Sequence, residues 1–400
     1  MKLAVIRRQF SATGGAELYL QRLMTALVDA GHEVHLFAEA WSGQAKDVKL
    51  HVVSVTGTRA TKPVRFAEAV RELTRREAFD CVFSLERTLK QDVYRAGDGV
   101  HRVWLERRRQ FAPWWKRPFI GRGAFHRNLL ALEARTFDPA NTSRIIVNSH
   151  MVKGEILRHF AFPEERIHLV RNGVDVKRFQ SGKRAGTRAR FGVKDDEFLL
   201  LFVGSGWERK GLKYVAGALT RLHLLLAKET FQASLAAVAE VARKTLRGEV
   251  NALPVALPVP FKRARLLVVG KGRPMSGPGG VIYADSLPDV ENAYAAADLL
   301  VFPPIYEPSS NVVAEALAAG LPVVTSEQNG ASEWIEEGRN GSVVENPSDI
   351  GVLVDAILFW MAHRPRPGVV SEYALSLERN VMETVSVLEQ AARERGALSS

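Results

Sequence analysis

The chain has 400 residues, of which 46% are hydrophobic and 25% are charged. This balance is typical of a soluble globular protein. The length is more than one core usually supports, so two domains of ordinary size are expected. No apolar run approaches the roughly 18 residues of a membrane span, which argues against an integral membrane protein.

The formal net charge of +11 implies an acidic partner. Nucleic acid, an anionic lipid surface and a phosphorylated ligand all fit that charge. Residues 1–6 are too short for a signal peptide and predict a first strand, so the protein is expected in the cytoplasm. The single cysteine, Cys81, fits a reducing compartment and is expected as a small core residue. No Cys/His cluster along the sequence indicates a metal site.

Predicted strands and helices alternate along the first part of the chain, which is the signature of a parallel α/β sheet. The first strand is followed by a loop that contains Gly14 and Gly15, and then by a helix at 16–30 with apolar residues at helical spacing. Ser149 is expected to cap a later helix at 151–159. The predicted strands of this series are 3–6, 33–38, 81–85, 144–148 and 168–171.

Residues 180–192 are polar and basic without periodicity, which predicts an interdomain linker. A second α/β series follows, and a last helix at 371–395 comes after all its strands, so we expect that helix to pack back across the first domain. The domains are predicted at 1–178 and 179–372, with 373–400 as the returning helix. The predicted strands of the second series are 198–203, 265–270, 281–284, 298–302, 322–326 and 342–345.

About fifty residues separate Lys213 from Lys262, where a βαβ connection normally needs one helix. Two helical patterns, at 215–226 and 230–246, precede a proline-spaced run. The excess, at about 223–261, is interpreted as an insertion. An extra surface helical hairpin is favoured there over a functional role.

Residues 102–127, the basic aromatic segment, hold eight Lys/Arg against one Glu, interleaved with aromatic side chains. Aromatic rings beside cations suit a membrane interface, where each Lys or Arg near an anionic surface contributes about 1 kcal/mol. We favour docking on the inner membrane surface or on an anionic glycolipid. Two other interpretations stay open: the rings are core residues, or the segment binds an anionic substrate.

Three signals lie where predicted strands end, which is where open α/β sheets bind ligands. Gly14 and Gly15 let the backbone approach a phosphate or sugar closely, although many loops carry such a pair. Arg209 and Lys210 follow the first strand of the second domain and suit a diphosphate. Cations oppose the dipole at a helix N-terminus, so their presence there favours a binding role over a solvated helix start.

The third signal is the stretch 303–325, which predicts a strand end, a loop, a helix and a second strand. Glu307 lies in the loop and Glu315 about two turns into the helix, roughly 12 Å apart at 1.5 Å per residue. A glycosidase pair needs roughly 5 to 9.5 Å, so the two carboxylates are expected to hold different parts of one long ligand. The free N–H groups of Ser310, Asn311 and Val312 at the helix start suit a phosphate.

Together these motifs closely resemble those of family 4 retaining glycosyltransferases of the GT-B fold. The resemblance rests on the Glu307-x7-Glu315 spacing, the following run 316–324, Arg209-Lys210-Gly211 upstream and Gly14-Gly15 early in the chain. The runs 172–175 and 329–333 look like further family signatures, and 97–109 is most similar to the lipopolysaccharide core glucosyltransferase I group. The resemblance implies two Rossmann-like domains whose parallel sheets face a central cleft.

The resemblance also implies roles for individual residues. Arg209 and Lys210 would neutralise the diphosphate leaving group, and Glu307 would hydrogen-bond hydroxyls of the donor sugar. Asp98 would reach the donor sugar and the acceptor hydroxyl, with His101 as a neighbour. The remaining contacts to the nucleotide sugar would come from Gly14, Gly15, Asn311, Val312 and Glu315.

The implied activity is transfer of a sugar, with retention, from a nucleotide-sugar co-substrate that is expected to be UDP-linked, with no other cofactor and no metal. The implied acceptor is a lipopolysaccharide core or related glycolipid at the inner membrane face. A soluble glycosyltransferase acting on a small molecule or polysaccharide is the alternative within enzymes. A basic nucleic-acid-binding protein is the alternative from another class, although no nucleic acid partner is expected.

Overall fold

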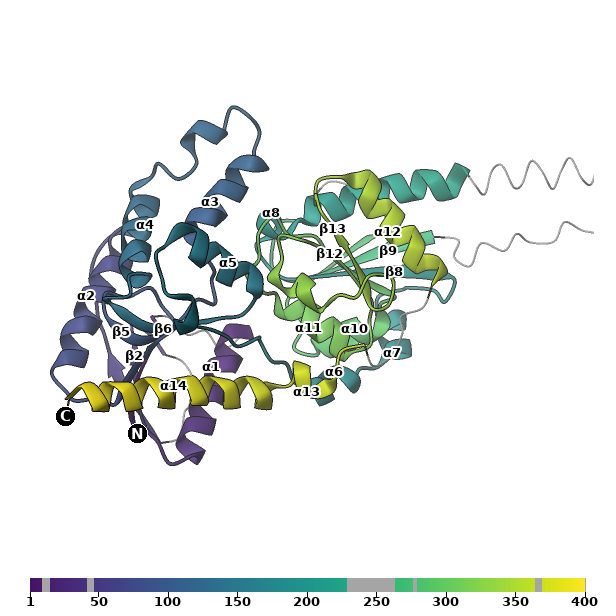
Figure 1. The fold of residues 1–400 in the computed structure, drawn as a ribbon. Helices are drawn as coiled ribbons and strands as arrows, with labels where there is room; N and C mark the ends of the chain where they lie inside the picture. The colour runs from purple at the N-terminus through teal and green to yellow at the C-terminus, as the bar shows by residue number, and fades with distance from the viewer. Residues whose placement is uncertain (9–14, 42–46, 229–262, 276–278, 364–368, 400) are drawn as a thin grey trace, which may run out of the picture.

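The computed structural model describes residues 1–8, 15–41, 47–228, 263–275, 279–363 and 369–399. They form two α/β bodies that lie side by side, and the chain passes from the first to the second and then returns (Figure 1). Each body is built on one sheet whose paired strands are all parallel. The predicted α/β fold with two parallel sheets is confirmed.

The first sheet has seven strands in the order β3-β2-β1-β4-β5-β6-β7. The strand order reverses between β1 and β4, and such a switch point opens a crevice at the carboxyl ends of the strands. The strands are β1 (Lys2–Ile6), β2 (Glu33–Ala38), β3 (Val48–Val52), β4 (Cys81–Ser84), β5 (Gln91–Arg95), β6 (Thr142–Val147) and β7 (Ile167–Leu169). The main helices are α1 (Gly15–Asp29), α2 (Lys62–Arg75), α3 (His101–Gln110), α4 (Ala124–Thr136) and α5 (His150–His159).

Strand β1 shows why this sheet is buried on both faces. Successive side chains point to opposite faces. Leu3 and Val5 pack in the core that contains the apolar face of α1, whereas Ala4 and Ile6 pack in the core that contains Phe66 of α2. Cys81 is fully buried in the first of these cores, as predicted, and burial raises the pKa of its thiol.

The second sheet has six strands in the order β10-β9-β8-β11-β12-β13, with its switch point between β8 and β11. The strands are β8 (Glu197–Val203), β9 (Arg263–Val269), β10 (Val281–Ala284), β11 (Leu299–Phe302), β12 (Val323–Ser326) and β13 (Gly341–Val344). The helices include α8 (Trp207–Lys210), α10 (Val290–Ala296), α11 (Asn311–Ala318) and α12 (Ile350–Ala362). Residues 212–228 are also helical, whereas the rest of the predicted insertion lies outside the described residues.

The predicted interdomain linker at 180–192 is wrong, because helix α7 (Arg184–Arg190) occupies it, just after α6 (Val176–Gln180). Both Arg184 and Arg188 form ion pairs with the buried Asp298, at 2.5 and 3.1 Å. Arg188 also donates hydrogen bonds to the carbonyls of Lys194 and Glu197. The basic residues that suggested a solvated linker therefore bind the buried end of α10 and the start of β11.

After α13 (Glu372–Leu375), the last helix, α14 (Leu377–Ser399), crosses from the second body and runs along the first (Figure 1). It packs on β4, β5, β6 and α1. Leu388 and Ala391 are buried in the core beneath it, and Arg395 forms an ion pair with Asp92 of β5 at 2.6 Å. The predicted return of the C-terminal helix to the first domain is confirmed.

Candidate functional site

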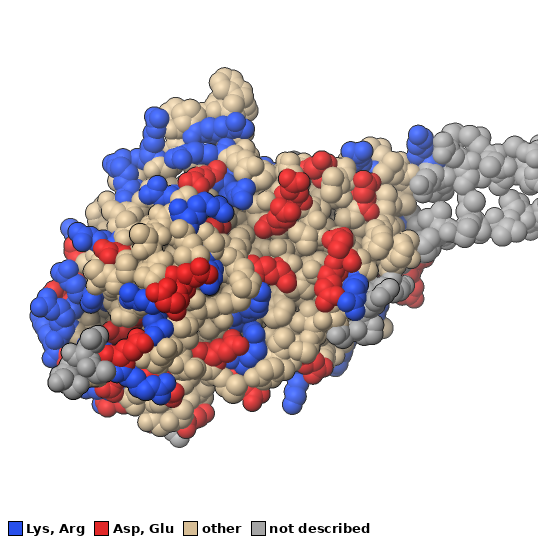
Figure 2. Space-filling model, in the orientation of Figure 1, with Lys and Arg blue, Asp and Glu red and all other residues tan. Residues whose placement is uncertain are grey.

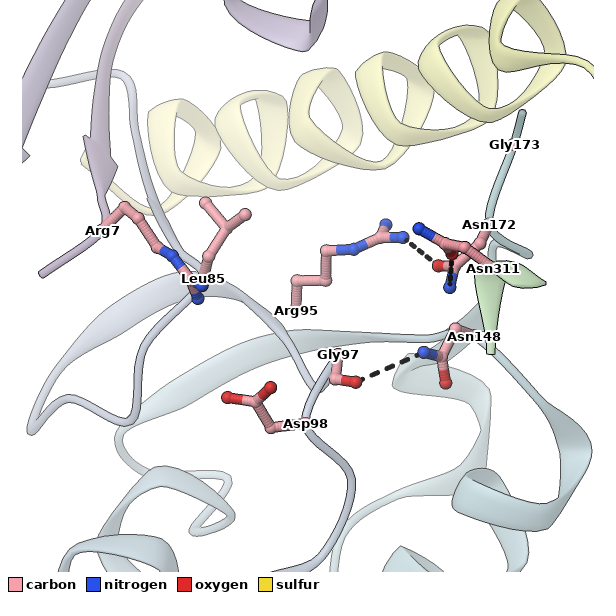
Figure 3. A pocket seen from close by; sticks show the side chains of 9 residues that line it. All are labelled: Arg7, Leu85, Arg95, Gly97, Asp98, Asn148, Asn172, Gly173 and Asn311. Carbon is pink, nitrogen blue, oxygen red and sulfur yellow. Dashed lines mark hydrogen bonds between the residues drawn. The ribbon is translucent and has the colours of Figure 1, made fainter. Parts of the chain in front are cut away.

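A pocket of about 100 Å³ lies between the two bodies (Figure 3). Its walls from the first body follow the carboxyl ends of β1, β4, β5, β6 and β7, where parallel sheets bind ligands. The second body contributes one residue, at the start of α11. The lining residues are Arg7, Leu85, Arg95, Gly97, Asp98, Asn148, Asn172, Gly173 and Asn311.

The pocket is lined by two guanidinium groups, one carboxylate and three carboxamides. Arg95 donates to Asn172 Oδ1 at 2.9 Å, and Asn172 Nδ2 donates in turn to Asn311 Oδ1 at 2.9 Å across the two bodies (Figure 3). Asn148 is buried and its Oδ1 has no hydrogen-bond partner among the described residues. The pocket therefore offers both donors and acceptors to a polyhydroxylated ligand, which is the kind of lining a sugar needs.

Asp98 is exposed at the turn that follows β5, and two groups hold that turn in place. Glu133 of α4 accepts hydrogen bonds from the N–H groups of His101 and Arg102, at 2.6 and 3.1 Å, and so caps α3. Arg87 pairs with Glu133 at 3.1 Å and donates to the Gly99 carbonyl at 2.8 Å. The chain on both sides of Gly99 is therefore fixed by a buried ion pair.

The imidazole of His101 faces His126, with Nε2 and Nδ1 3.0 Å apart, and it is not among the pocket-lining residues. Burial lowers the pKa of His101 to about 4, with Arg87 and His126 adding to the effect. The ring is therefore neutral near pH 7 and a weak base. It is a structural neighbour of the turn rather than a group that reaches the pocket.

The predicted cation pair lies in α8, directly after β8 and the left-handed Gly206. Lys210 passes over Gly204, where an added Cβ would lie 2.5 Å from Nζ, and the φ of +130° at this position favours glycine. Burial lowers the pKa of Lys210, opposed by the charges of Glu307 and Glu315. The charges of both predicted carboxylates therefore act on this lysine.

Arg209 forms an ion pair with Glu307, with Nη2 and Oε2 3.1 Å apart. The backbone of Glu307 is held on both sides, because its N–H donates to Gln328 and its carbonyl accepts from Gly330. The structure thus brings a predicted diphosphate-binding residue into direct contact with a predicted sugar-binding residue.

Glu315 lies on the second turn of α11 and accepts a hydrogen bond from the Tyr294 hydroxyl at 2.5 Å. Burial raises its pKa, while Tyr294, Arg178 and Lys210 oppose the shift. A tyrosine donor on one carboxylate oxygen leaves the other available to a ligand diol.

The start of α11 differs in one respect from the sequence prediction. Ser310 is the N-cap, but its N–H is not free, because it donates to Asn329 Oδ1 at 3.2 Å. Asn311 and Val312 open the helix, where N–H groups lack partners within the helix. The possible phosphate donors at this end are therefore the N–H groups of Asn311 and Val312.

Loops of the second body also dock directly on the first, through residues to which the sequence analysis assigned no role. The hydroxyl of the buried Tyr306 donates to Glu155 at 2.7 Å and accepts from the Val100 N–H at 2.9 Å. Glu333 caps α5 by accepting from two N–H groups of that helix and also pairs with Arg171 at 2.8 Å. Burial raises the pKa of Glu155 to about 7.

The predicted site residues therefore fall into two groups. Asp98 and Asn311 line the interdomain pocket, whereas Arg209, Lys210, Glu307 and Glu315 all belong to the second body and do not line it. Gly15 begins α1, and Gly14 lies outside the described residues. The pocket residues that the analysis missed are Arg7, Leu85, Arg95 and Asn148. These four residues directly follow or end strands, and that position could have revealed them. The analysis noted Asn172 only as part of a family signature.

The basic aromatic segment forms a projection built by α3, the short 3₁₀ helix Arg117–Phe119 and α4 (Figure 1). Lys and Arg side chains gather over this projection (Figure 2). Trp114, Trp115 and Phe119 are 76%, 57% and 74% exposed, so the core interpretation fails for these three rings. It holds for Trp104, which packs beside Tyr306 with ring centroids 6.3 Å apart. Within the part of the chain that the structure describes, no helix is long and apolar enough to span a membrane.

Two family profiles match the chain. The profile described as Glycosyltransferase Family 4 matches residues 13–178, and the one described as Glycosyl transferases group 1 matches residues 232–363. The chain is a glycosyltransferase. The two profiles divide between the first and the second body.

Curated relatives of this glycosyltransferase differ in their acceptors. A glycosyltransferase of Methanocaldococcus jannaschii is 28% identical over 265 residues, which are 63% of this chain and 61% of that protein. The lipopolysaccharide glucosyltransferase WaaG of Escherichia coli is 24% identical over 84% of this chain and 82% of its own. The D-inositol 3-phosphate glycosyltransferase of Paenarthrobacter aurescens is 26% identical over the same shares.

Solved structures agree on the fold. The crystal structure of WaaG superposes with a TM-score of 0.70 at 22% identity, over 98% of each chain. The structure of Anabaena HepE in complex with UDP and glucose superposes with a TM-score of 0.66 at 15% identity, over 97% of this chain and 99% of that one. The predicted GT-B architecture is confirmed.

Proposed function

We propose that this glycosyltransferase transfers a sugar, with retention, from a nucleotide-sugar donor to a lipopolysaccharide core or related glycolipid at the inner face of the cytoplasmic membrane. The observation that carries the proposal is the ion pair of Arg209 with Glu307, together with the charges of Glu307 and Glu315 that act on Lys210, in the body that shares the interdomain pocket with Asp98. In this proposal the cations bind a diphosphate, and the carboxylates bind two sets of hydroxyls.

The donor is expected to be UDP-linked, in keeping with the UDP and glucose named for the HepE structure. Lys210 and Arg209 would bind the diphosphate and stabilise the negative charge that develops as it leaves, an electrostatic contribution of the preorganised kind. Two fixed cations can supply the charge that a divalent ion supplies in other transferases, so transfer is expected to need no metal. Glu315 would accept hydrogen bonds from the ribose diol, and Glu307 from the transferred sugar.

Retention would follow from attack on the face that the diphosphate leaves. The bond from the anomeric carbon to the diphosphate oxygen breaks, the acceptor oxygen bonds to the same carbon, and the acceptor proton passes to the departing diphosphate oxygen. Asp98, across the cleft, would orient the acceptor hydroxyl. A covalent sugar intermediate on a carboxylate is the less favoured route, because Glu307 is already paired with Arg209.

The acceptor proposal rests on the projection of α3 and α4. Its exposed rings at Trp114, Trp115 and Phe119, flanked by Lys and Arg, suit the headgroup region of an anionic membrane. The relation to WaaG points the same way. The inositol phosphate relatives favour a second candidate, a soluble phosphorylated acceptor, which Arg7 and Arg95 of the pocket would suit.

Calorimetric titration with UDP, GDP and ADP tests the donor half. Wild-type protein should bind one of them, and Lys210→Ala and Glu315→Ala should weaken that binding, whereas Glu307→Ala should mainly lower turnover of the nucleotide sugar. The matched control is Lys213→Ala, since Lys213 is exposed and stacks on Tyr214. Wild-type behaviour of all three site variants would refute the assignment, and salt-sensitive oligonucleotide binding without nucleotide binding would replace it.

Co-sedimentation with vesicles tests the acceptor half. Each ring that enters the membrane interface is expected to contribute about 1 kcal/mol. Replacing Trp114, Trp115 and Phe119 by serine should therefore weaken binding to anionic vesicles roughly 100-fold. Met382→Ser removes an exposed apolar side chain elsewhere and should have no effect. If the wild type does not bind anionic vesicles, the membrane proposal fails and the soluble acceptor is favoured.

A further inference from the structure

A group of three potential metal ligands lies at the edge of the first sheet, apart from the interdomain pocket. His35 is on β2, His51 is on β3, and Glu77 is in the connection between α2 and β4. His35 Nδ1 lies 2.8 Å from His51 Nε2 and 3.8 Å from Glu77 Oε2. All three ligand atoms lie within 4.8 Å of one another, and no other such group occurs among the described residues.

The parallel sheet explains why the two imidazoles meet. His51 is paired with Phe37, which lies two residues beyond His35, so all three side chains point to the same face of the sheet. The ring of His51 stacks on Phe37 with centroids 4.4 Å apart, and His35 packs edge-on against Phe79 at 5.1 Å. Apolar packing therefore fixes both rings with their nitrogens facing each other.

The carboxylate of Glu33 decides which ring nitrogen of His35 carries the hydrogen. His35 Nε2 lies 2.9 Å from Glu33 Oε1, so this nitrogen carries the hydrogen and Nδ1 presents its lone pair to His51 and Glu77. A ligating histidine in a metal site almost always donates its second ring N–H to a carboxylate or carbonyl in this way. The side chain of His35 is 3% exposed, which suits a ligand whose orientation is fixed.

Lysine side chains pair with Glu77 and Glu33. Lys2 pairs with the other oxygen of Glu77, Oε1, at 2.6 Å, and Lys49 pairs with Glu33. Two carboxylates are thus each paired with an ammonium group beside the imidazoles. Glu77 Oε2 remains on the side of the histidines.

We propose that His35, His51 and Glu77 bind a divalent transition metal, with Zn²⁺ as the first candidate. Two imidazole nitrogens and a carboxylate oxygen are ligands that zinc takes, and Zn–N distances of about 2.0–2.1 Å place tetrahedral ligands roughly 3.3 Å apart. The observed distances from His35 Nδ1 are 2.8 Å to His51 Nε2 and 3.8 Å to Glu77 Oε2, one shorter and one longer than that spacing. Water completes the tetrahedron from the partly exposed side of His51 and Glu77.

The proposed site ties three segments together. The edge strand β3 has a single neighbour in the sheet, β2, and the metal adds a second attachment through Glu77 to the connection that leads into β4. None of the three ligands lines the interdomain pocket. The site is therefore structural, and it is independent of the proposed glycosyl transfer. The sequence showed no metal cluster because the ligands are spread over residues 35–77 and only the fold brings them together.

Titration of untagged, metal-stripped protein with Zn²⁺ and Co²⁺ tests the proposal. We expect one ion per chain, a Co²⁺ absorption band in the visible range that Zn²⁺ abolishes, and a raised melting temperature with Zn²⁺. His51→Ala and Glu77→Gln should each weaken binding about 100-fold, and Glu33→Gln, which only orients His35, about 10-fold. Circular dichroism and nucleotide binding verify that the variants are folded.

His363→Ala is the matched control, because His363 is exposed and bonds to the carbonyl of Phe359 in its own helix. It should leave metal binding unchanged. If Zn²⁺ binds the wild type no tighter than His51→Ala, the two imidazoles share only a hydrogen bond and the proposal is wrong. Equal losses in His363→Ala would likewise assign the binding to scattered surface histidines.

Discussion

The hydroxyl of Tyr306 offers the sharpest test of how the two bodies are held together. Tyr306 belongs to the second body, is 1% exposed, and bonds to Val100 and Glu155 of the first. It immediately precedes Glu307 in the chain, and Val100 lies two residues after Asp98. One hydroxyl thus fixes the acceptor-side turn relative to the donor-side carboxylate. Tyr306→Phe removes that oxygen and keeps the ring.

The size of the effect follows from the two groups that lose their partner. A buried donor or acceptor left unsatisfied costs about 1–3 kcal/mol. Glu155 can take up a proton, because its pKa is raised to about 7, so the lower part of that range applies to it. A total of about 3 kcal/mol lowers the ratio of docked to separated bodies roughly 100-fold. The folding of each body is unaffected, because the lost bonds lie between them.

We therefore expect Tyr306→Phe to lower turnover of the nucleotide sugar by up to about 100-fold while nucleotide binding, for which we propose Lys210 and Glu315, stays within about twofold. Turnover is followed by release of the nucleotide diphosphate, and binding by calorimetry. Tyr373→Phe is the control, since Tyr373 is 55% exposed. Wild-type turnover in Tyr306→Phe would show that the hydroxyl does not position the site, and an equal loss of nucleotide binding would show damage to the second body instead.

Three further predictions concern buried ionisable side chains. Because burial raises the pKa of Glu155 from 4.5 to about 7, the folded protein loses stability as pH rises between those values. Glu155→Gln should therefore raise the free energy of unfolding at pH 8 by up to about 3 kcal/mol, seen as a higher melting temperature, and leave it unchanged near pH 4.5. Asp298→Ala leaves Arg188 buried without its carboxylate and should cost about 3–5 kcal/mol in urea unfolding. The buried thiol of Cys81 should react with Ellman's reagent only after unfolding, and rapid reaction of native protein would contradict its place in the core.

The strands that sequence analysis found are those whose apolar character is continuous. It missed β3 and β5 for two different reasons. β3 is an edge strand, where Leu50 and Val52 are 45% and 63% exposed, so no buried run marks it. β5 is central but carries Gln91 and Asp92, which are satisfied by partners on other elements: Asp92 accepts from the Val82 N–H at 2.7 Å. Buried polar side chains of this kind look like loop residues until the fold supplies their partners.

The error at α7 has the same origin. The basic run that holds Arg184 and Arg188 predicts a linker, yet the side chain of Asp298, more than a hundred residues away, is what makes them part of the second body. Charge patterning describes a segment by itself. It cannot distinguish a solvated cation from one that pairs with a distant buried carboxylate.

The positions of the residues proposed to bind the donor could be predicted because these residues lie in short contiguous motifs. Arg209 and Lys210 follow one strand directly, and Glu307 and Glu315 follow another, so local reasoning places them at the ends of neighbouring strands β8 and β11. The docking contacts could not be predicted in the same way, because each joins residues of different bodies. Tyr306 and Glu155 are separated by 151 positions.

Donor binding and docking of the two bodies share the same short stretch of backbone. Tyr306, which docks on the first body, and Glu307, which pairs with Arg209, are adjacent, and Pro308 accepts a hydrogen bond from Ser149 of the first body at 2.7 Å. A donor sugar that competes with Arg209 for Glu307 therefore acts on the backbone that carries the docking contacts. Because linkage between two equilibria is reciprocal, we expect whatever weakens docking, such as Tyr306→Phe, to change affinity for the complete nucleotide sugar more than affinity for the nucleotide alone.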